Sequence, residues 1–171
     1  MQPIWTPSAQ RIEAANITRF RRHVNSTLSL SLENYGQLHR WSILERESFW
    51  EAVWHFTGII SSRSYNSVLT DGDKFPDAKW FQGSQLNFAE NLLRYQDDVT
   101  ALVFVAENGD RQQTSYAELH ERVAELQRSL IDVGIQKGDR VAAYLPNIPE
   151  TVIAMLATTS LGAVWSSCSP D

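Results

Sequence analysis

The 171-residue sequence has little cysteine, no long hydrophobic run and no leader-like start. Its single cysteine, Cys168, excludes an internal disulfide and is typical of a protein in a reducing compartment. No apolar run approaches the ~20 residues that a membrane-spanning helix needs. The first residues lack the basic start and apolar stretch of a secretory signal. We therefore expect a soluble, cytoplasmic protein with no membrane partner.

A strong charge of one sign is also lacking, since 15 Lys and Arg stand against 20 Asp and Glu, for a net charge of −5. Residues 1–80 contain nine of these basic and eight of these acidic residues, and residues 81–171 contain six and twelve. Nucleic-acid phosphates need a basic surface, so the acidic second half argues against a nucleic-acid partner. We interpret the one dense basic cluster, at residues 19–23, as an exposed helix face.

The common signatures of phosphate, metal and acyl chemistry are missing as well. The sequence has no G-x-G-x-x-G and no G-x-x-x-x-G-K-[ST] phosphate loop. Its four histidines are far apart and have no partners at metal-ligand spacing, so we predict no metal site. Ser166, Ser167 and Ser169 lie outside any G-x-S-x-G elbow, which argues against a nucleophilic serine. Cys168 has small and apolar neighbours and is predicted to be a buried small hydrophobe.

What is present in the first half is a helical pattern rich in aromatic residues. Ser8 is a predicted N-cap, and apolar residues such as Phe20, Trp41 and Trp54 recur at helical spacing behind it. Gly58 stands where a helix C-cap glycine belongs. Five of the six tryptophans lie in residues 1–80, and we expect them to form a core because large rings bury the most area.

A polar, irregular stretch at residues 59–79 follows, with turn signals but no periodicity. Trp80 and Phe81 come next, before a glycine. We predict that these two rings are buried hooks that hold the N-terminal helices against the following domain. Residues 86–93 resemble a short helix.

From residue 100 the pattern changes to alternating strands and helices. Asn108 and Gly109 predict a two-residue hairpin turn between two strands. Ser115 and Glu118 form a predicted capping box at the start of a helix, and Pro149 suits the first turn of the next helix. We predict strands at residues 101–106, 111–114, 141–145 and 163–168, with helices after the second and third strands. A strand, a helix and a second strand form a right-handed parallel unit. The predicted fold class is therefore α/β: a helical N-terminal segment, residues 1–95, leads into the start of an open, mostly parallel α/β sheet domain, residues 96–171.

Several segments resemble a known superfamily. Residues 80–93, WFQGSQLNFAENLL, resemble the segment that precedes the large domain in acetyl-CoA-synthetase-like enzymes of the adenylate-forming superfamily. Residues 114–119, TSYAEL, are similar to the first core motif of that superfamily. Residues 138–150, GDRVAAYLPNIPE, and 161–164, LGAV, resemble its next landmarks in the right order. The opening residues 5–20, the aromatic residues near Trp41 and Trp50, and the ending WSSCSPD are similar to the branch that activates acetoacetate.

This resemblance implies an ATP-dependent ligase reaction in two steps. Acetoacetate attacks the α-phosphate of ATP, with Mg²⁺ balancing the phosphate charge, and the thiol of CoA then displaces AMP. The family's phosphate loop, ribose-binding aspartate and catalytic lysine are expected beyond residue 171, so we assign no catalytic residue here and expect the chain alone to be inactive.

Ser169, Pro170 and Asp171 are the only candidate binding residues. They follow a predicted parallel strand at its carboxyl end, where open α/β sheets bind ligands, and the resemblance places them near CoA. A Pro-Asp turn that only redirects the chain is the alternative interpretation. Two other functions stay open: a ligase for another short-chain acid, and a non-catalytic interaction module.

Overall fold

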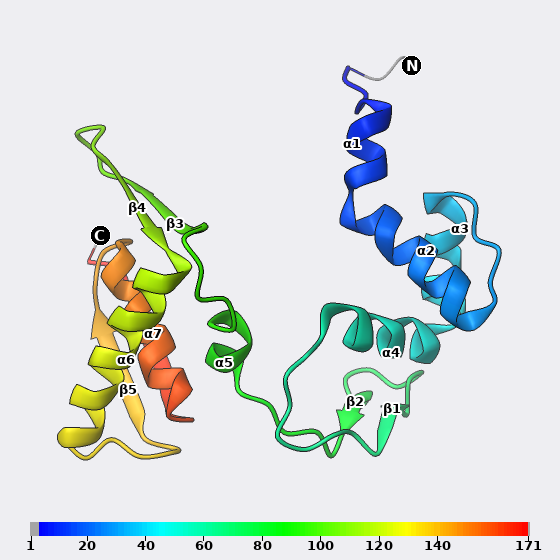
Figure 1. The fold of residues 1–171 in the computed structure, drawn as a ribbon. Coiled ribbons are helices and arrows are strands. Elements are labelled where there is room, and N and C mark those ends of the chain that lie inside the picture. Colours follow the sequence, from blue (N-terminus) through cyan, green and yellow to red (C-terminus); the bar gives the residue numbers. More distant parts are fainter. Residues whose placement is uncertain (1–3, 171) are drawn as a thin grey trace. The chain divides into compact units, whose positions relative to one another are not determined.

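The computed structural model describes residues 4–170 (Figure 1). These residues divide into two compact units. The first contains residues 4–59 and 64–84, and the second contains residues 60–63 and 85–170. The domain division predicted after residue 95 stays a prediction, although α5, at Phe88–Leu92, packs on α7 inside the second unit.

The first unit begins with four helices: α1 at Ala9–Ala14, α2 at Asn16–Leu28, α3 at Tyr35–Leu44 and α4 at Arg46–Thr57. The predicted N-cap is confirmed, because the Ser8 hydroxyl accepts the Arg11 N–H at 3.2 Å. Gly58 ends α4 in the left-handed region at φ 62°, also as predicted. The helical backbone is interrupted between α1 and α2 at Ala15, whose ψ of 140° lies in the extended region.

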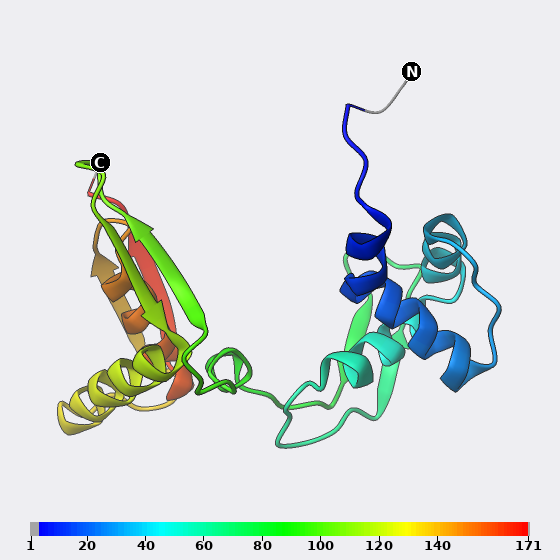
Figure 2. The same ribbon diagram turned by 45° about the horizontal axis from the view of Figure 1, so that its top comes forward.

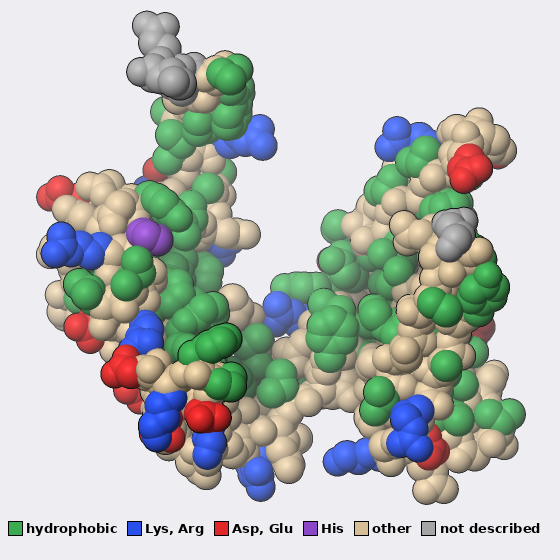
Figure 3. Space-filling view, turned by 180° about the vertical axis from the view of Figure 1, so that it is seen from behind, with side chains coloured by type: hydrophobic (Ala, Val, Ile, Leu, Met, Phe, Trp, Pro, Cys, Tyr) green, Lys and Arg blue, Asp and Glu red, His purple; other side chains and the backbone are tan. Residues whose placement is uncertain are grey.

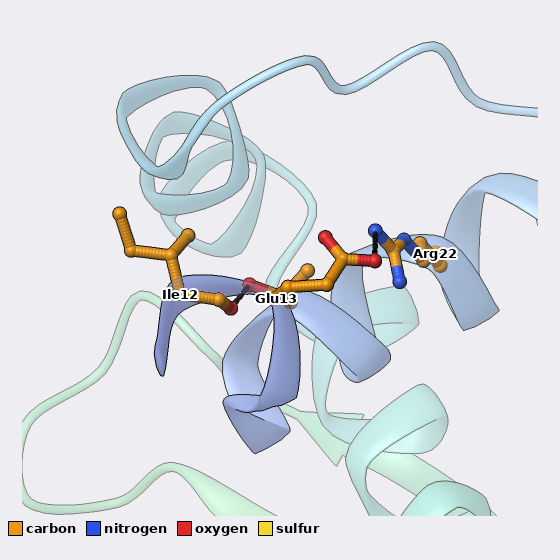
Figure 4. Close-up of polar contacts among 4 residues, drawn as sticks. Ile12, Glu13 and Arg22 are labelled. Atoms are coloured by element: carbon orange, nitrogen blue, oxygen red, sulfur yellow. Dashed lines mark hydrogen bonds and ion pairs between the residues drawn. The ribbon is translucent and has the colours of Figure 1, made fainter. Parts of the chain in front are cut away.

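Polar contacts hold α1 against α2 at this break (Figure 4). The Thr18 hydroxyl donates to the Ile12 carbonyl at 2.6 Å, and the Arg22 guanidinium pairs with the Glu13 carboxylate. None of the residues of α1 is buried. The helix therefore depends on these contacts with α2 rather than on a core of its own.

The core of the first unit is aromatic, as expected. Phe20 is buried, and its ring lies edge-on to those of Phe49, at 5.7 Å between centroids, and Phe56, at 5.1 Å. Edge-to-face ring pairs of this kind add stability beyond the area that they bury. The other buried members of the cluster are Val24, Leu38, Trp41 and Ala52.

A two-stranded antiparallel sheet of β1, Ser67–Thr70, and β2, Lys79–Gln82, completes the first unit. Phe81 is partly buried and tilts against Trp54 at 4.7 Å. Trp80 is 43% exposed, so the prediction that it is buried was wrong. Its ring meets Trp50 edge-on at 5.9 Å, and a single edge-on contact leaves much of an indole uncovered.

The second unit follows the predicted order of elements closely. After α5 come β3 at Thr100–Val105, β4 at Arg111–Ser115, α6 at Tyr116–Asp132, β5 at Arg140–Tyr144, α7 at Pro149–Ser160 and β6 at Val164–Cys168. The β3–β4 hairpin is antiparallel (Figure 2), but its turn is longer than the two residues predicted, because the Ala106 N–H donates to the Asp110 carbonyl at 2.9 Å and residues 107–109 lie between them. Both halves of the predicted capping box are present at the start of α6. Pro149 is at the start of α7, as predicted.

The β5–α7–β6 segment is the predicted parallel unit, with Arg140 opposite Val164 and Tyr144 opposite Cys168. Helices α6 and α7 run side by side (Figure 1). Their buried residues Leu119, Val123, Ile153, Leu156 and Ala157 form one core with Ala89 of α5. The α/β fold class is confirmed. Within residues 4–170 the six strands form three two-stranded sheets, of which one is parallel.

Few of the strands are covered on both faces. Val103 and Val105 of β3, Tyr144 of β5 and Val164 of β6 are all more than half exposed. Apolar side chains accordingly lie on the surface of the second unit (Figure 3). Two-stranded sheets are marginal by themselves, and parallel strands are normally covered on both faces. None of the helices formed by residues 4–170 is long and apolar enough to cross a membrane.

Candidate functional site at the carboxyl ends of β5 and β6

The carboxyl ends of β5 and β6 meet at one edge of the second unit, because the two strands are parallel and in register. Open α/β sheets bind ligands at this edge. Residues paired in the register share a face of the sheet, so Tyr144 and Cys168 lie on the same face.

The sequence-predicted loop begins here. Ser169 and Pro170 follow β6 directly and are exposed, and Asp171 lies outside the described residues. Two hydrogen bonds join this end of β6 to β5. The Leu145 N–H donates to the Cys168 carbonyl at 3.3 Å, and the Tyr144 hydroxyl donates to the Pro170 carbonyl at 3.1 Å.

Sequence reasoning missed Tyr144. One signal could have found it: Tyr144 ends a predicted strand that is parallel to the strand ending at Cys168, and so comes to the same edge. A tyrosine also has a hydroxyl that needs a partner. The partner itself, a carbonyl 26 residues away, could not be read from the sequence.

Cys168 is exposed, so the prediction of a buried cysteine was wrong. Its small and apolar neighbours suggested a covered strand, but none of the residues of β6 is buried. Ser166 and Ser167 are exposed as well. The carboxyl edge therefore presents hydroxyl groups, one thiol and backbone groups to solvent.

The N-terminus of α7 follows the carboxyl end of β5 along the chain. Its first turn contains an acidic residue, whose charge offsets the positive end of the helix dipole. Glu150, in the first turn, accepts a hydrogen bond from the Arg122 guanidinium at 2.8 Å. This bond, with a backbone hydrogen bond, lowers the pKa of Glu150 below its ordinary value. A helix N-terminus favours an anion, and here a carboxylate of the chain is present at that position. We therefore do not expect a phosphate group to bind at this terminus.

The hollows of the second unit include two that border the ends of α7. A mainly apolar one of about 200 Å³ is lined by residues 102–105 of β3 and by residues 147–149 and Val152 around the start of α7. A polar one of about 590 Å³ lies beside the last residues of α7, where His120 and Gln96 are hydrogen-bonded at 3.1 Å. The other residues that line the polar hollow are Ile60, Asn87, Glu90, Leu93, Arg94, Gln127 and Ser160.

Neither hollow fits Mg²⁺ and a nucleotide triphosphate. Magnesium in such sites is held by carboxylates together with phosphate oxygens, and residues 4–170 contain no group of three or more His, Cys, Asp or Glu that could hold a metal ion. The described residues thus provide the carboxyl edge of a parallel strand pair, with no cluster of three or more potential metal ligands among residues 4–170.

Comparison with known proteins agrees with this geometry. Residues 88–171 match the family described as AMP-binding enzyme, and residues 35–92 match the family described as acetyl-coenzyme A synthetase N-terminus. The two matches follow each other along the chain in the order that the sequence motifs predicted. The second half of the chain is thus similar to AMP-binding enzymes, and the preceding residues are similar to the N-terminus of acetyl-coenzyme A synthetase.

The chain is also similar to acetoacetyl-CoA synthetases along nearly its whole length. It is 42% identical over 99% of its length to the acetoacetyl-coenzyme A synthetase of Rhizobium meliloti, of which it covers 26%. It is 39% identical over 98% of its length to the malonamoyl-CoA synthetase of Penicillium aethiopicum, of which it covers 24%. The solved structure of acetoacetyl-CoA synthetase from Streptomyces lividans matches all of the chain at 43% identity with a TM-score of 0.88, over 27% of that structure. The chain thus spans about a quarter of the length of its relatives.

Proposed function

We propose that this chain is the N-terminal part of a cytoplasmic ATP-dependent acid–CoA ligase that makes acetoacetyl-CoA. The complete enzyme joins acetoacetate to the α-phosphate of ATP and releases pyrophosphate. The thiol of CoA then takes the acetoacetyl group and releases AMP. The substrates are small molecules, and Mg²⁺ is the expected metal.

One observation carries this proposal: a single continuous match to acetoacetyl-CoA synthetases covers both compact units. The match to the Streptomyces lividans structure covers 100% of the chain at 43% identity, so the likeness is not limited to the common AMP-binding fold. A free-standing interaction module is disfavoured by the second unit itself, where exposed apolar strands lack the cover that parallel strands normally have.

A second acid is a specific alternative. The malonamoyl-CoA synthetase of Penicillium aethiopicum is 39% identical to the chain, against 42% for the Rhizobium meliloti acetoacetyl-coenzyme A synthetase. Malonamate and acetoacetate share a carboxylate followed by a methylene and a carbonyl, and differ only in the group on that carbonyl, which is an amino group in malonamate and a methyl group in acetoacetate. A difference of this size is decided by a few pocket side chains.

Within this enzyme we propose that Ser169, Pro170 and Asp171 belong to a loop close to CoA. The loop leaves the carboxyl edge of the parallel strands, and Ser169 and Pro170 are exposed there. It offers uncharged backbone groups and one hydroxyl, while a carboxylate at Asp171 repels phosphates at short range. The loop therefore suits the uncharged parts of CoA rather than its phosphates, and CoA supplies the thiol that accepts the acyl group.

The test is carried out on the full-length protein. We expect acetoacetate-dependent exchange of pyrophosphate into ATP in the absence of CoA, and acetoacetyl-CoA formation when CoA is added. Malonamate and acetate serve as competing acids at equal concentrations. Exchange that is faster with malonamate would transfer the proposal to the second acid, and no exchange with any acid would contradict a ligase altogether.

The 171-residue chain by itself is the matched negative control. We expect it to support no exchange, because its described residues hold neither a metal group nor a phosphate loop. Exchange by the isolated chain above a blank reaction would show that the ATP site lies within these residues after all.

A further inference from the structure

The strand β5 ends in an exposed tyrosine whose hydroxyl reaches across to the loop after β6. Tyr144 is 67% exposed, and its phenol donates to the Pro170 carbonyl at 3.1 Å. An exposed tyrosine has ample water to bond, so packing does not force this contact. The bond joins two points of the chain that are 26 residues apart.

A second hydrogen bond beside it holds Cys168, the last residue of β6. The Leu145 N–H donates to the Cys168 carbonyl at 3.3 Å, immediately after the last register pair, Tyr144 with Cys168. Ser169 therefore lies between two residues whose carbonyls are both bonded to the end of β5. The ring of Pro170 fixes its own φ, and a residue before proline is restricted to extended conformations. The loop thus has few conformations left when both bonds are formed.

We propose that Tyr144 is a positioning residue for CoA binding, which it supports by tying the loop at Ser169 and Pro170 to the end of β5. This inference rests on the proposed function, because it assumes that the loop lies close to CoA. Tyr144 acts through the loop and not on the reacting atoms. A loop that is already ordered loses less conformational freedom when a ligand binds, and affinity rises accordingly.

The size of the effect follows from the kind of bond. A neutral hydrogen bond of this type contributes modestly, and its loss corresponds to about a 2- to 10-fold change in an equilibrium constant. Tyr144→Phe removes only the hydroxyl. In the full-length protein we expect the KM for CoA to rise about 2- to 10-fold, while kcat at saturating CoA and ATP–pyrophosphate exchange without CoA stay unchanged.

Tyr35→Phe is the matched control. Tyr35 of α3 is 68% exposed and lies in the first unit, and its ring stacks on His39. We expect this variant to change neither the KM for CoA nor the exchange rate. An unchanged KM for CoA in Tyr144→Phe would overturn the inference. So would an equal loss in both half-reactions, because that pattern indicates a structural role only.

A physical measurement makes the test independent of activity. Amide hydrogen exchange of the peptide that covers residues 164–171 is expected to speed up in Tyr144→Phe and not in Tyr35→Phe. If the wild-type protein shows no acid-dependent exchange of pyrophosphate, the proposed function fails. The amide measurement still tests whether the Tyr144 hydroxyl holds the loop after β6 in place. Faster amide exchange then supports it, and equal amide exchange overturns it.

Discussion

Replacing Asn87 should loosen two helices at once, because its side chain bonds to both. Its carbonyl oxygen caps α5 by accepting the Glu90 N–H at 3.1 Å. Its amide group donates to the carbonyls of Thr159 at 2.9 Å and Ser160 at 3.2 Å, at the C-terminus of α7. Loss of an N-cap costs about 1 kcal/mol, and each partly buried neutral hydrogen bond contributes about 0.5–1.5 kcal/mol. Asn87→Ala should therefore cost about 2–4 kcal/mol.

Two further variants separate these contributions. Asn87→Ser keeps a capping oxygen and loses the donors, so it should recover about 1 kcal/mol. Asn34→Ala is the matched control, because the Asn34 side chain caps α3 through Gln37 at 3.0 Å and has no described bond to another helix. We expect this control to cost about 1 kcal/mol, the value for a cap alone.

Native-state amide exchange in the full-length protein measures each cost where it arises, because local opening can be followed without a global unfolding transition. Amides of α5 and of the last turn of α7 should lose about 1–3 kcal/mol more protection in Asn87→Ala than amides of α3 lose in Asn34→Ala. Equal losses in the two variants would refute the reasoning, because they would mean that the bonds to α7 contribute nothing.

Three other predictions follow from the first unit. Gly83→Ala should destabilise the unit by more than 1 kcal/mol as measured by thermal unfolding, because φ is 92° and a Cβ would come within 2.7 Å of a side-chain nitrogen. Gly109→Ala is the control and should cost less, because Gly109 has a similar φ of 88° but open space around it. A larger cost for Gly109→Ala would contradict the geometry. Burial raises the pKa of Tyr65, and so do a hydrogen bond to Glu51 and the charge of Glu51, so the contribution of Tyr65 to stability is present below pH 10.0 and is lost as the pH rises through the folded-state pKa. A tyrosine titration followed by absorbance should lose a step above pH 10.0 in Tyr65→Phe, and an unchanged titration would contradict this. Trp80→Ala should cost less than the ~3–5 kcal/mol typical of a buried tryptophan, since the ring is 43% exposed, and a KM for ATP that changes more than the melting temperature would indicate a binding role instead.

Most helices and strands could be predicted because their signals act between close neighbours along the chain. The Ser115 capping box, the turn at Gly109 and the proline at the start of α7 each depend on contacts within a few residues. The strands β1 and β2 were harder. Residues 67–70 lie in a polar stretch without alternation, and they form a strand because residues 79–82 pair with them.

The candidate loop could be placed from the sequence for a similar reason. A strand, a helix and a strand dictate a parallel pair, so the residues after the second strand come to the carboxyl edge. The family could be recognised as well, because its motifs are short and local. Exposure was predicted less well: Cys168 and Trp80 were both expected to be buried, and neither is.

Secondary structure was easier to predict than burial because its signals act between residues that are close together in the sequence. Periodicity, caps and turns are decided by neighbouring residues, so the order of the elements and the parallel β5–α7–β6 unit could be derived from the amino acids alone. Which faces are covered, and which distant groups meet, depends on how the elements pack. The bond from Tyr144 to Pro170 spans 26 residues, and that from Asn87 to Thr159 spans 72. Only the tertiary structure brings such groups within hydrogen-bonding distance, because no local pattern specifies the packing that joins them.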